Sequence, residues 1–325
     1  MFFVGLIVAI LLMICGFLVL GWGAHILVHG AASFAKKLGV PPLVIGLTII
    51  AIGTSVPEIV ISLISAIHRT PDIAIGNAVG SNIANIGLVL GITAMVTPLK
   101  MRSRTIRKEL PLLFLVMLLV SILLLDGMLS FLDAMILMGV SSIVVLWLVI
   151  QGMRRHTPQT VLEAEVKKEI PRRIHLTITV FQMLIGLVLL PIGSKVVVES
   201  ATYIARLFHV RDIVIGLTVV AIGTSLPELA TAIMGACKKE YEIVIGNIVG
   251  SNIFNLLAVL PISALLHPVV LHSQIVLRDF SVMFALTILL YIFSFGLRGP
   301  EKTTRFEGFF LLLVYVIYLG SLFFV

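Results

Sequence analysis

The stretch that decides the fold is GLTIIAIGTSVPE, from Gly46 to Glu58, because it recurs almost unchanged as GLTVVAIGTSLPE from Gly216 to Glu228. The two copies are 170 residues apart, and the same offset continues downstream without a gap. IGNAVGSNIAN, which ends at Asn85, is matched by IGNIVGSNIFN, which ends at Asn255. Two unrelated apolar helices would not repeat Thr, Ser, Pro, Glu and Asn in register, so the chain contains an internal duplication.

The composition around these stretches is that of a membrane protein. Of the 325 residues, 59% are hydrophobic and only 12% are charged, and the mean hydropathy is +1.18. A soluble globular domain carries about 25% charged residues. This excludes an ordinary cytosolic enzyme, a disordered chain and a nucleic-acid binder. Cys15 and Cys237 lie in apolar runs and provide no disulfide framework.

The apolar runs are long enough to cross a bilayer as helices. A hydrocarbon core about 30 Å thick needs roughly 20 apolar residues of helix, because lipid offers no partners to an irregular backbone. The first run has no charged residue up to Ala35 and lacks the basic start of a signal peptide, so we expect it to stay in the membrane. We therefore predict an all-α membrane protein with about ten transmembrane helices. The predicted spans are 1–35, 41–67, 73–99, 110–125, 134–152, 174–194 with a continuation past Lys195, 213–237, 243–277, 280–297 and 308–325.

The basic residues predict how these spans are oriented. When the loops are numbered alternately, 18 Lys and Arg residues fall on one side of the membrane and four on the other. Basic loops face the cytoplasm in most membrane proteins. The net charge of +7 is then mainly a topological signal, and both termini are predicted to lie outside.

The duplication implies an inverted arrangement of two halves. Residues 1–152 form the first five-helix repeat, 153–173 a charged cytoplasmic connector and 174–325 the second repeat. Because five is odd, the second copy enters the membrane from the opposite side. Inverted repeats with interrupted helices are typical of transporters that bind their substrate near the midplane.

Glu58 and Glu228 are the only acidic residues deep in the second and seventh predicted spans. A carboxylate at that depth costs several kcal/mol and usually marks an ion or proton pathway. A single buried glutamate could also be protonated or paired for structural reasons. Two glutamates at equivalent repeat positions favour the ion pathway.

Helical spacing gathers hydroxyl groups and a free carbonyl around each glutamate. Thr54 and Ser55 lie four and three residues before Glu58, on the same helix face. Pro57 has no N–H group, so a kink there should free the carbonyl of Gly53. The second copy provides the same set: Gly223, Thr224, Ser225, Pro227 and Glu228.

The third and eighth predicted spans add amide and hydroxyl groups at helical spacing. We assign the Ser and Asn residues to cation binding and the small glycines of the same spans to close helix packing. The polar set is Ser81, Asn82, Asn85, Ser251, Asn252 and Asn255, and the glycines are Gly76, Gly80, Gly246 and Gly250.

The combined site contains only oxygen donors of hard character. Ca²⁺ takes six to eight such oxygens in a flexible shell, whereas Mg²⁺ prefers to keep its waters. The glutamates have no accompanying Cys, His or Met cluster, which disfavours zinc and copper. One Ca²⁺ balances two carboxylates, and so do two Na⁺ or two H⁺. An empty pair would face an idealised Born cost on the order of 20 kcal/mol per carboxylate, so the chain should be an obligate exchanger.

The motifs GTSVPE, GSNIAN, GTSLPE and GSNIFN resemble the repeats of the calcium/cation antiporter superfamily, and in particular its prokaryotic sodium/calcium exchangers. The resemblance covers nearly the whole chain. It implies Ca²⁺/Na⁺ antiport by alternating access in the plasma (inner) membrane of a prokaryote, with inorganic cations as cargo and no cofactor or obligate protein partner. The implied ligands are Thr54, Ser55, Glu58, Ser81, Asn85, Thr224, Ser225, Glu228, Ser251 and Asn255, with the carbonyls of Ala51 and Ala221.

Some points stay open at this level. The proline argument favours the carbonyl of Gly53 and the resemblance favours Ala51. Potassium-dependent relatives carry Asp at the position of Asn255, so potassium coupling is disfavoured. Ca²⁺/H⁺ antiport and, less favoured, a cation channel are the alternatives to sodium coupling. An intramembrane hydrolase using Ser55 or Ser225 lacks a histidine at matching positions, so we do not expect an enzyme.

Two further charged residues, Lys195 and Glu199, lie four apart in the predicted sixth span. They occupy the positions equivalent to His25 and His29 in the first. We expect the lysine and glutamate to pair with each other.

Overall fold

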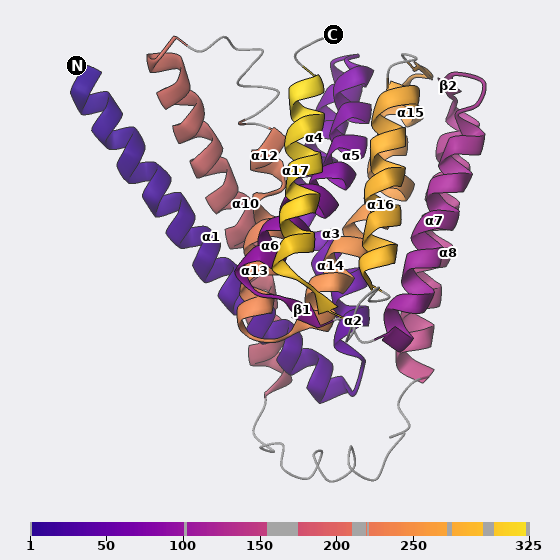
Figure 1. Cartoon of the computed structure of the whole chain (residues 1–325), viewed down its shortest axis with the longest axis horizontal. Coiled ribbons are helices and arrows are strands. Elements are labelled where there is room, and N and C mark those ends of the chain that lie inside the picture. The colour runs from indigo at the N-terminus through magenta and orange to yellow at the C-terminus, as the bar shows by residue number, and fades with distance from the viewer. Residues whose placement is uncertain are drawn as a thin grey trace.

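The computed structural model describes residues 2–100, 103–154, 175–209, 219, 221–271, 275–294 and 302–322. Most of the predicted connector, residues 155–173, lies outside this part of the chain, as do 213–218 and 220 of the predicted seventh span. The described residues are mostly helical (Figure 1).

The first half contains the helices and strands α1 (Phe2–Leu38), α2 (Pro42–Ile45), η1 (Gly46–Ile50), α3 (Ala51–Thr54), α4 (Val56–Ile67), α5 (Pro71–Ala84), η2 (Asn85–Leu90), α6 (Gly91–Val96), β1 (Leu99–Lys100), α7 (Ser103–Leu123), β2 (Met128–Leu129) and α8 (Phe131–Arg154). The second half contains α10 (Leu176–Leu207), α12 (Ala221–Thr224), α13 (Leu226–Cys237), α14 (Tyr241–Phe254), η4 (Asn255–Val259), α15 (Leu260–Leu266), β3 (Val269–Val270), η5 (Ile275–Asp279), α16 (Phe280–Ser294), β4 (Lys302–Thr303) and α17 (Arg305–Ser321).

Among the described residues, six helices are long and apolar enough to cross a membrane. They are Gly5–Leu38, Pro71–Val96, Phe131–Gln151, Leu176–Leu207, Tyr241–Leu266 and Leu277–Ser294. A seventh candidate is the pair Pro42–Thr54 and Val56–Ile67, which is bent by 44°. Shorter apolar helices cover Glu109–Leu123 and Leu226–Cys237. Helices thus occur in all ten predicted segments, while the count of ten crossings stays a prediction.

One predicted boundary is wrong. The apolar segment 243–277 is not one helix, because α15 ends at Leu266 and His267 is extended, with φ −148° and ψ 134°. Pro268 follows and disfavours a helical conformation of the residue before it. The short strand β3 then begins at Val269.

The duplication is visible in the backbone. The breaks at Ser55 and Ser225 have nearly equal dihedrals, φ −81° and ψ 9° against φ −86° and ψ 2°. Left-handed residues also fall 170 apart, at Arg69 with φ 58° and Lys239 with φ 62°. At the centre, Asn82 Nδ2 donates to the carbonyl of Asn252 at 3.2 Å, and Asn252 Nδ2 donates back to the carbonyl of Asn82 at 3.5 Å. The two copies therefore meet around a local two-fold axis.

Two small antiparallel pairings connect loops that the alternate numbering places on the same side. β1 pairs with β4, and β2 pairs with β3. The first pairing brings Lys100 opposite Lys302. It lies near the end of the bundle opposite the chain termini, which we call the basic end, whereas α1 starts and α17 finishes at the other end, the terminal end (Figure 1).

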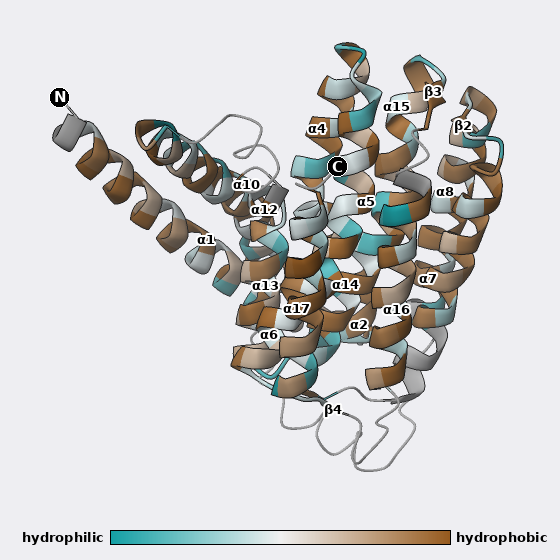
Figure 2. Cartoon of the chain, turned by 45° about the horizontal axis from the view of Figure 1, so that its top comes forward, coloured by the Kyte–Doolittle hydropathy of each residue, from teal (hydrophilic) through white to brown (hydrophobic). Residues whose placement is uncertain are grey.

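α1 and α10 form a closely packed pair that leans away from the other helices (Figure 1). A Cβ added at Gly16 would lie 2.7 Å from Val197, and one at Gly186 would lie 2.6 Å from Leu27. These two contacts are equivalent under the 170-residue offset. The pair itself is thus symmetric, and Figure 2 shows that its residues, like those of α7, α8 and α16, are predominantly hydrophobic.

Candidate cation-binding site

The interrupted helices place a glutamate at the start of a buried helix in each repeat. Glu58 lies in the first turn of α4 and Glu228 in the first turn of α13, immediately after the breaks at Ser55 and Ser225. Both side chains are only 1% exposed. The positive end of each helix dipole then faces a carboxylate, which favours its charged form and partly offsets the cost of burial.

The carboxyl group of Glu58 has one weak partner. Ser81 of α5 donates to Glu58 Oε1 at 3.4 Å, and within the described part of the chain Oε2 has no hydrogen-bond donor. Asn77 of α5 donates to the backbone carbonyl of Glu58 at 3.0 Å and to Ser62 Oγ at 3.3 Å. The backbone at Glu58 is thereby held in place while one carboxylate oxygen remains available to a ligand.

Glu228 faces the first repeat. Its carboxyl group lies close to Thr54, Ser55 and Glu58. Its Oε2 also has no hydrogen-bond donor among the described residues. Two buried carboxyl groups thus meet between the repeats, each with an uncommitted oxygen, and a cation between them would relieve their repulsion.

Hydroxyl groups from both repeats converge beside this pair. Thr54 Oγ1 donates to Asn247 Oδ1 of α14 at 3.1 Å, which leaves its lone pairs free to accept or to coordinate. Ser251 Oγ of α14 lies 3.5 Å from the carbonyl oxygen of Ala51. The hydroxyl oxygen of Ser55 is buried and has no partner in the described chain.

The asparagines that follow α5 and α14 differ between the repeats. Asn85 Nδ2 donates to Asn252 Oδ1 at 3.0 Å. The equivalent bond from Asn255 to Asn82 is not formed, and in the described chain both Asn255 side-chain atoms and Asn82 Oδ1 have no partner. Buried polar atoms are normally hydrogen-bonded, so a group of unpartnered ones points to a ligand site.

The structure treats the two alternative carbonyls differently. The carbonyl of Gly223, freed by Pro227, accepts a hydrogen bond from Ser194 of α10 at 2.6 Å. In the first repeat, the carbonyl of Ala51 accepts from the backbone N–H of Ser55 at 3.1 Å and lies next to the Ser251 hydroxyl. Ala51 therefore lies among the hydroxyl groups of the site, whereas Gly223 is already bonded to α10.

Eleven of the twelve predicted ligand residues have described side chains, and all eleven lie in the interior, at most 9% exposed. They are Ala51, Thr54, Ser55, Glu58, Ser81, Asn85, Thr224, Ser225, Glu228, Ser251 and Asn255. The twelfth, Ala221, is the first residue of α12. The described residues hold no cluster of three or more His, Cys, Asp or Glu side chains suited to a metal. Besides the two carboxyl groups, a bound cation would therefore depend on hydroxyl, amide and carbonyl oxygens. Coordination by these residues stays a prediction.

Two asparagines of the site escaped the sequence prediction. Asn77 and Asn247 are 170 residues apart, and each binds a residue of the Thr54–Glu58 segment. The sequence repeat could have identified them, because both asparagines belong to the repeated IGN triplet.

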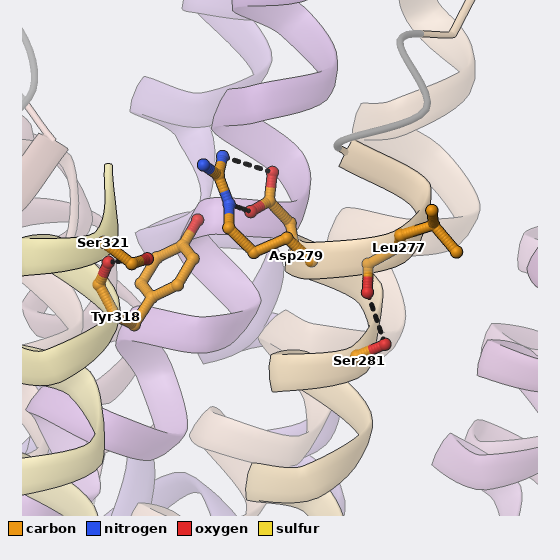
Figure 3. A network of polar contacts seen from close by, with 6 residues as sticks. Leu277, Asp279, Ser281, Tyr318 and Ser321 are labelled. Carbon is orange, nitrogen blue, oxygen red and sulfur yellow. Dashed lines mark hydrogen bonds and ion pairs between the residues drawn. The ribbon is translucent and has the colours of Figure 1, made fainter. Parts of the chain in front are cut away.

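Two further buried acids were also missed. Glu109 and Asp279, again 170 apart, are 2% and 7% exposed. Predicted spans began at 110 and 280, so these residues were placed in loops, whereas α7 and η5 already include them. Figure 3 shows Asp279 paired with Arg278, whose Nε lies 2.6 Å from Oδ1, beside Tyr318 of α17. This ion pair lies on η5, and we assign it no cation role.

Among the described residues around the site, those of α14 are packed more tightly than the equivalent residues of α5. A Cβ added at Gly246 would lie 2.5 Å from the carbonyl oxygen of Leu43, and one at Gly250 would lie 2.6 Å from that of Leu47. At the equivalent Gly76, no described atom lies within 4 Å of such a Cβ. Ile243 of α14 is fully buried, while its counterpart Ile73 is 55% exposed.

This comparison confirms the glycine assignment in the second repeat. Gly246 and Gly250 pack against α2 and η1 as predicted, whereas the close packing of Gly76 and Gly80 stays a prediction, because residues 213–217, the repeat equivalents of 43–47, lie outside the described part of the chain. Since α14 begins at the basic end and α5 at the terminal end, the site is closed towards the basic end and less covered towards the terminal end (Figure 1).

A duplicated helical membrane protein with two facing buried carboxyl groups, surrounded by neutral oxygen donors, is by class a carrier of small cations. The sodium/calcium exchanger protein family matches residues 8–150 and 178–324, so the chain belongs to that family. It is therefore a membrane cation antiporter and not an enzyme.

Two relatives and a solved structure match this chain over nearly their full lengths. The chain is 39% identical over 318 residues to the putative antiporter CaxA of Alkalimonas amylolytica, covering 98% of this chain and 99% of the relative. It is 38% identical over 324 residues to the inner membrane protein YrbG of Escherichia coli, covering 98% of each. The solved structure of the sodium-calcium exchanger NCX_Mj aligns with a TM-score of 0.82 at 30% identity, over 97% of this chain and 99% of that one.

Proposed function

We propose that the chain exchanges Ca²⁺ for Na⁺ across the plasma (inner) membrane of a prokaryote by alternating access. The observation that carries this proposal is the pair of buried, facing glutamates, each with an unpartnered carboxylate oxygen. One Ca²⁺ or two Na⁺ would neutralise the pair. The donors around it are hydroxyl, amide and carbonyl oxygens, which both ions accept.

The names of the relatives support the choice of ions. NCX_Mj is described as a sodium-calcium exchanger, and MaX1 of Methanosarcina acetivorans, 30% identical over 351 residues, as a sodium/calcium exchanger. Following the distribution of basic loops, we place the basic end in the cytoplasm and both termini outside. The closed basic end then corresponds to a state whose site faces outwards.

Ion coupling is tested by flux into proteoliposomes. Uptake of ⁴⁵Ca²⁺ should require an outward sodium gradient and should stop when sodium is replaced by choline. A pH gradient without sodium that drives uptake equally well would instead establish Ca²⁺/H⁺ antiport. Uptake without any counter-ion, at rates far above carrier turnover, would indicate a channel.

The hydrogen bond between Thr54 and Asn247 should set the calcium affinity. With Asn247→Leu, the Thr54 hydroxyl keeps only its more distant acceptor, the carbonyl of Ala51 at 3.4 Å, so its oxygen is oriented less firmly towards a cation. We expect the KM for Ca²⁺ to rise about tenfold, because a buried hydrogen bond contributes about 1 to 1.5 kcal/mol. A double-mutant cycle with Thr54→Val checks the pairing, since the two effects should not add. Additive effects would show that Asn247 acts independently of Thr54.

A further inference from the structure

The α1–α10 pair covers the same face of the two repeats unequally. In α13, Leu226, Ala230 and Met234 pack against the apolar cluster to which α1 contributes Ala24 and Leu27. In α4 the equivalent residues are exposed: Val56 by 39%, Val60 by 46% and Ile64 by 50%. One apolar face is thus covered by α1, and its repeat mate is left open.

A hydrogen bond joins α1 to the end of α13. Lys238 Nζ donates to the backbone carbonyl of His25 at 3.0 Å. Lys238 lies in the turn after α13 and is partly buried, and this burial lowers its pKa although Glu240 acts in the opposite direction. A partly desolvated ammonium group that holds a helix carbonyl restrains the position of α1 relative to α13.

The repeat offset identifies the counterpart of this bond. The mate of Lys238 is His68, at the end of α4, and the mate of His25 is Lys195, on α10. Both side chains are exposed, and Lys195 forms an ion pair with Glu199 at 3.7 Å, as the sequence predicted. In the present state, therefore, the donor position on α4 is exposed, whereas Lys238 at the equivalent position is partly buried.

A second contact has no counterpart at all. Ser194 of α10 donates to the Gly223 carbonyl at 2.6 Å. The mates of these residues are Ala24 and Gly53, and an alanine cannot donate such a bond. The bonds of Lys238 and Ser194 thus join the α1–α10 pair to the second repeat in the present state. The repeat equivalent of the Lys238 bond can form against the first repeat, but that of the Ser194 bond cannot.

We propose that Lys238 and Ser194 are positioning residues that hold the α1–α10 pair in the present state, and that in the opposite state α10 covers the exposed face of α4 while His68 donates to the carbonyl of Lys195. The inference rests on the proposed alternating-access function. Because Ala24 provides no counterpart to Ser194, the present state is the favoured one. The exposed row of Val56, Val60 and Ile64 is then the contact surface of α10 and not a permanent lipid-facing surface.

Cysteine accessibility tests this inference without any flux measurement. In a background with Cys15→Ala and Cys237→Ala, Ile73→Cys reports exposure of α5 and Ile243→Cys reports exposure of α14. Lys238→Met should slow labelling of the first by a membrane-impermeant maleimide and speed labelling of the second. Loss of a hydrogen bond to a charged group should change the ratio of the two rates about tenfold. Labelling of Ile73→Cys from outside intact cells also checks the orientation.

Matched variants separate this role from general damage. Lys239→Met removes the same charge from the neighbouring exposed residue and should leave the ratio unchanged. His68→Lys, a change on the surface, should shift the ratio in the same direction as Lys238→Met, because it strengthens the opposite tie. Ala24→Ser should do the same.

An unchanged ratio in Lys238→Met, or a shift of His68→Lys in the other direction, would overturn the inference. The labelling is done without ion gradients. A failure of sodium coupling in the flux assay would therefore count against the proposed function and leave the labelling result standing.

Discussion

Glu58→Gln and Glu228→Gln should each reduce sodium-driven ⁴⁵Ca²⁺ uptake to the level of empty liposomes. With one carboxyl group neutral, a bound Ca²⁺ leaves a net positive charge in a site that is 1% exposed. The effective penalty for an uncompensated buried charge is several kcal/mol. Since about 1.4 kcal/mol is a factor of ten, we expect a loss of at least about 100-fold in exchange.

The matched control for these variants is Glu199→Gln. It makes the same chemical change at a glutamate whose side chain is 66% exposed and paired with the exposed Lys195, so uptake should stay close to that of the unmodified chain. Elution as a single species from a sizing column shows that each variant is folded. Near-normal exchange by a folded Glu58→Gln or Glu228→Gln protein would remove the site assignment.

The position of the site could be predicted from the sequence because its chemistry conflicts with its surroundings. An apolar run that contains a glutamate, a proline and two hydroxyl residues indicates a polar site within the membrane. The recurrence of the same residues 170 positions later strengthens this interpretation. The proline argument also located the break correctly, since the chain bends by 44° between Thr54 and Val56.

The state of the molecule could not be predicted from the same residues. The two copies carry nearly identical motifs, yet the α14 face is packed against α2 and η1 while the equivalent face of α5 is exposed. A repeated sequence can adopt either of two equivalent packings, and the choice depends on tertiary contacts such as those of Ser194 and Lys238. Glu109 and Asp279 were missed for a simpler reason: hydropathy places the start of a span after a charged residue, even where the helix begins earlier.

The largest expected difference between equivalent residues is that between Gly246 and Gly76. Gly246→Ala places a methyl group 2.5 Å from the Leu43 carbonyl oxygen and 3.0 Å from the Cα of Gly46. Both are backbone atoms that cannot turn aside. Overpacking of this kind costs about 1 to 3 kcal/mol, so the thermal midpoint should fall.

Gly76→Ala should separate stability from transport. Its methyl group meets no described atom within 4 Å, and alanine is favoured over glycine within a helix by about 1 kcal/mol. The thermal midpoint, followed by the fluorescence of Trp22 and Trp147, should therefore stay the same or rise. Exchange should nevertheless fall at least about tenfold, because in the opposite state this face must pack as closely as Gly246 does now, and a cost above 1.4 kcal/mol there is more than a factor of ten. Equal stability losses in the two variants, or normal exchange by Gly76→Ala, would show that the faces of α5 and α14 do not alternate.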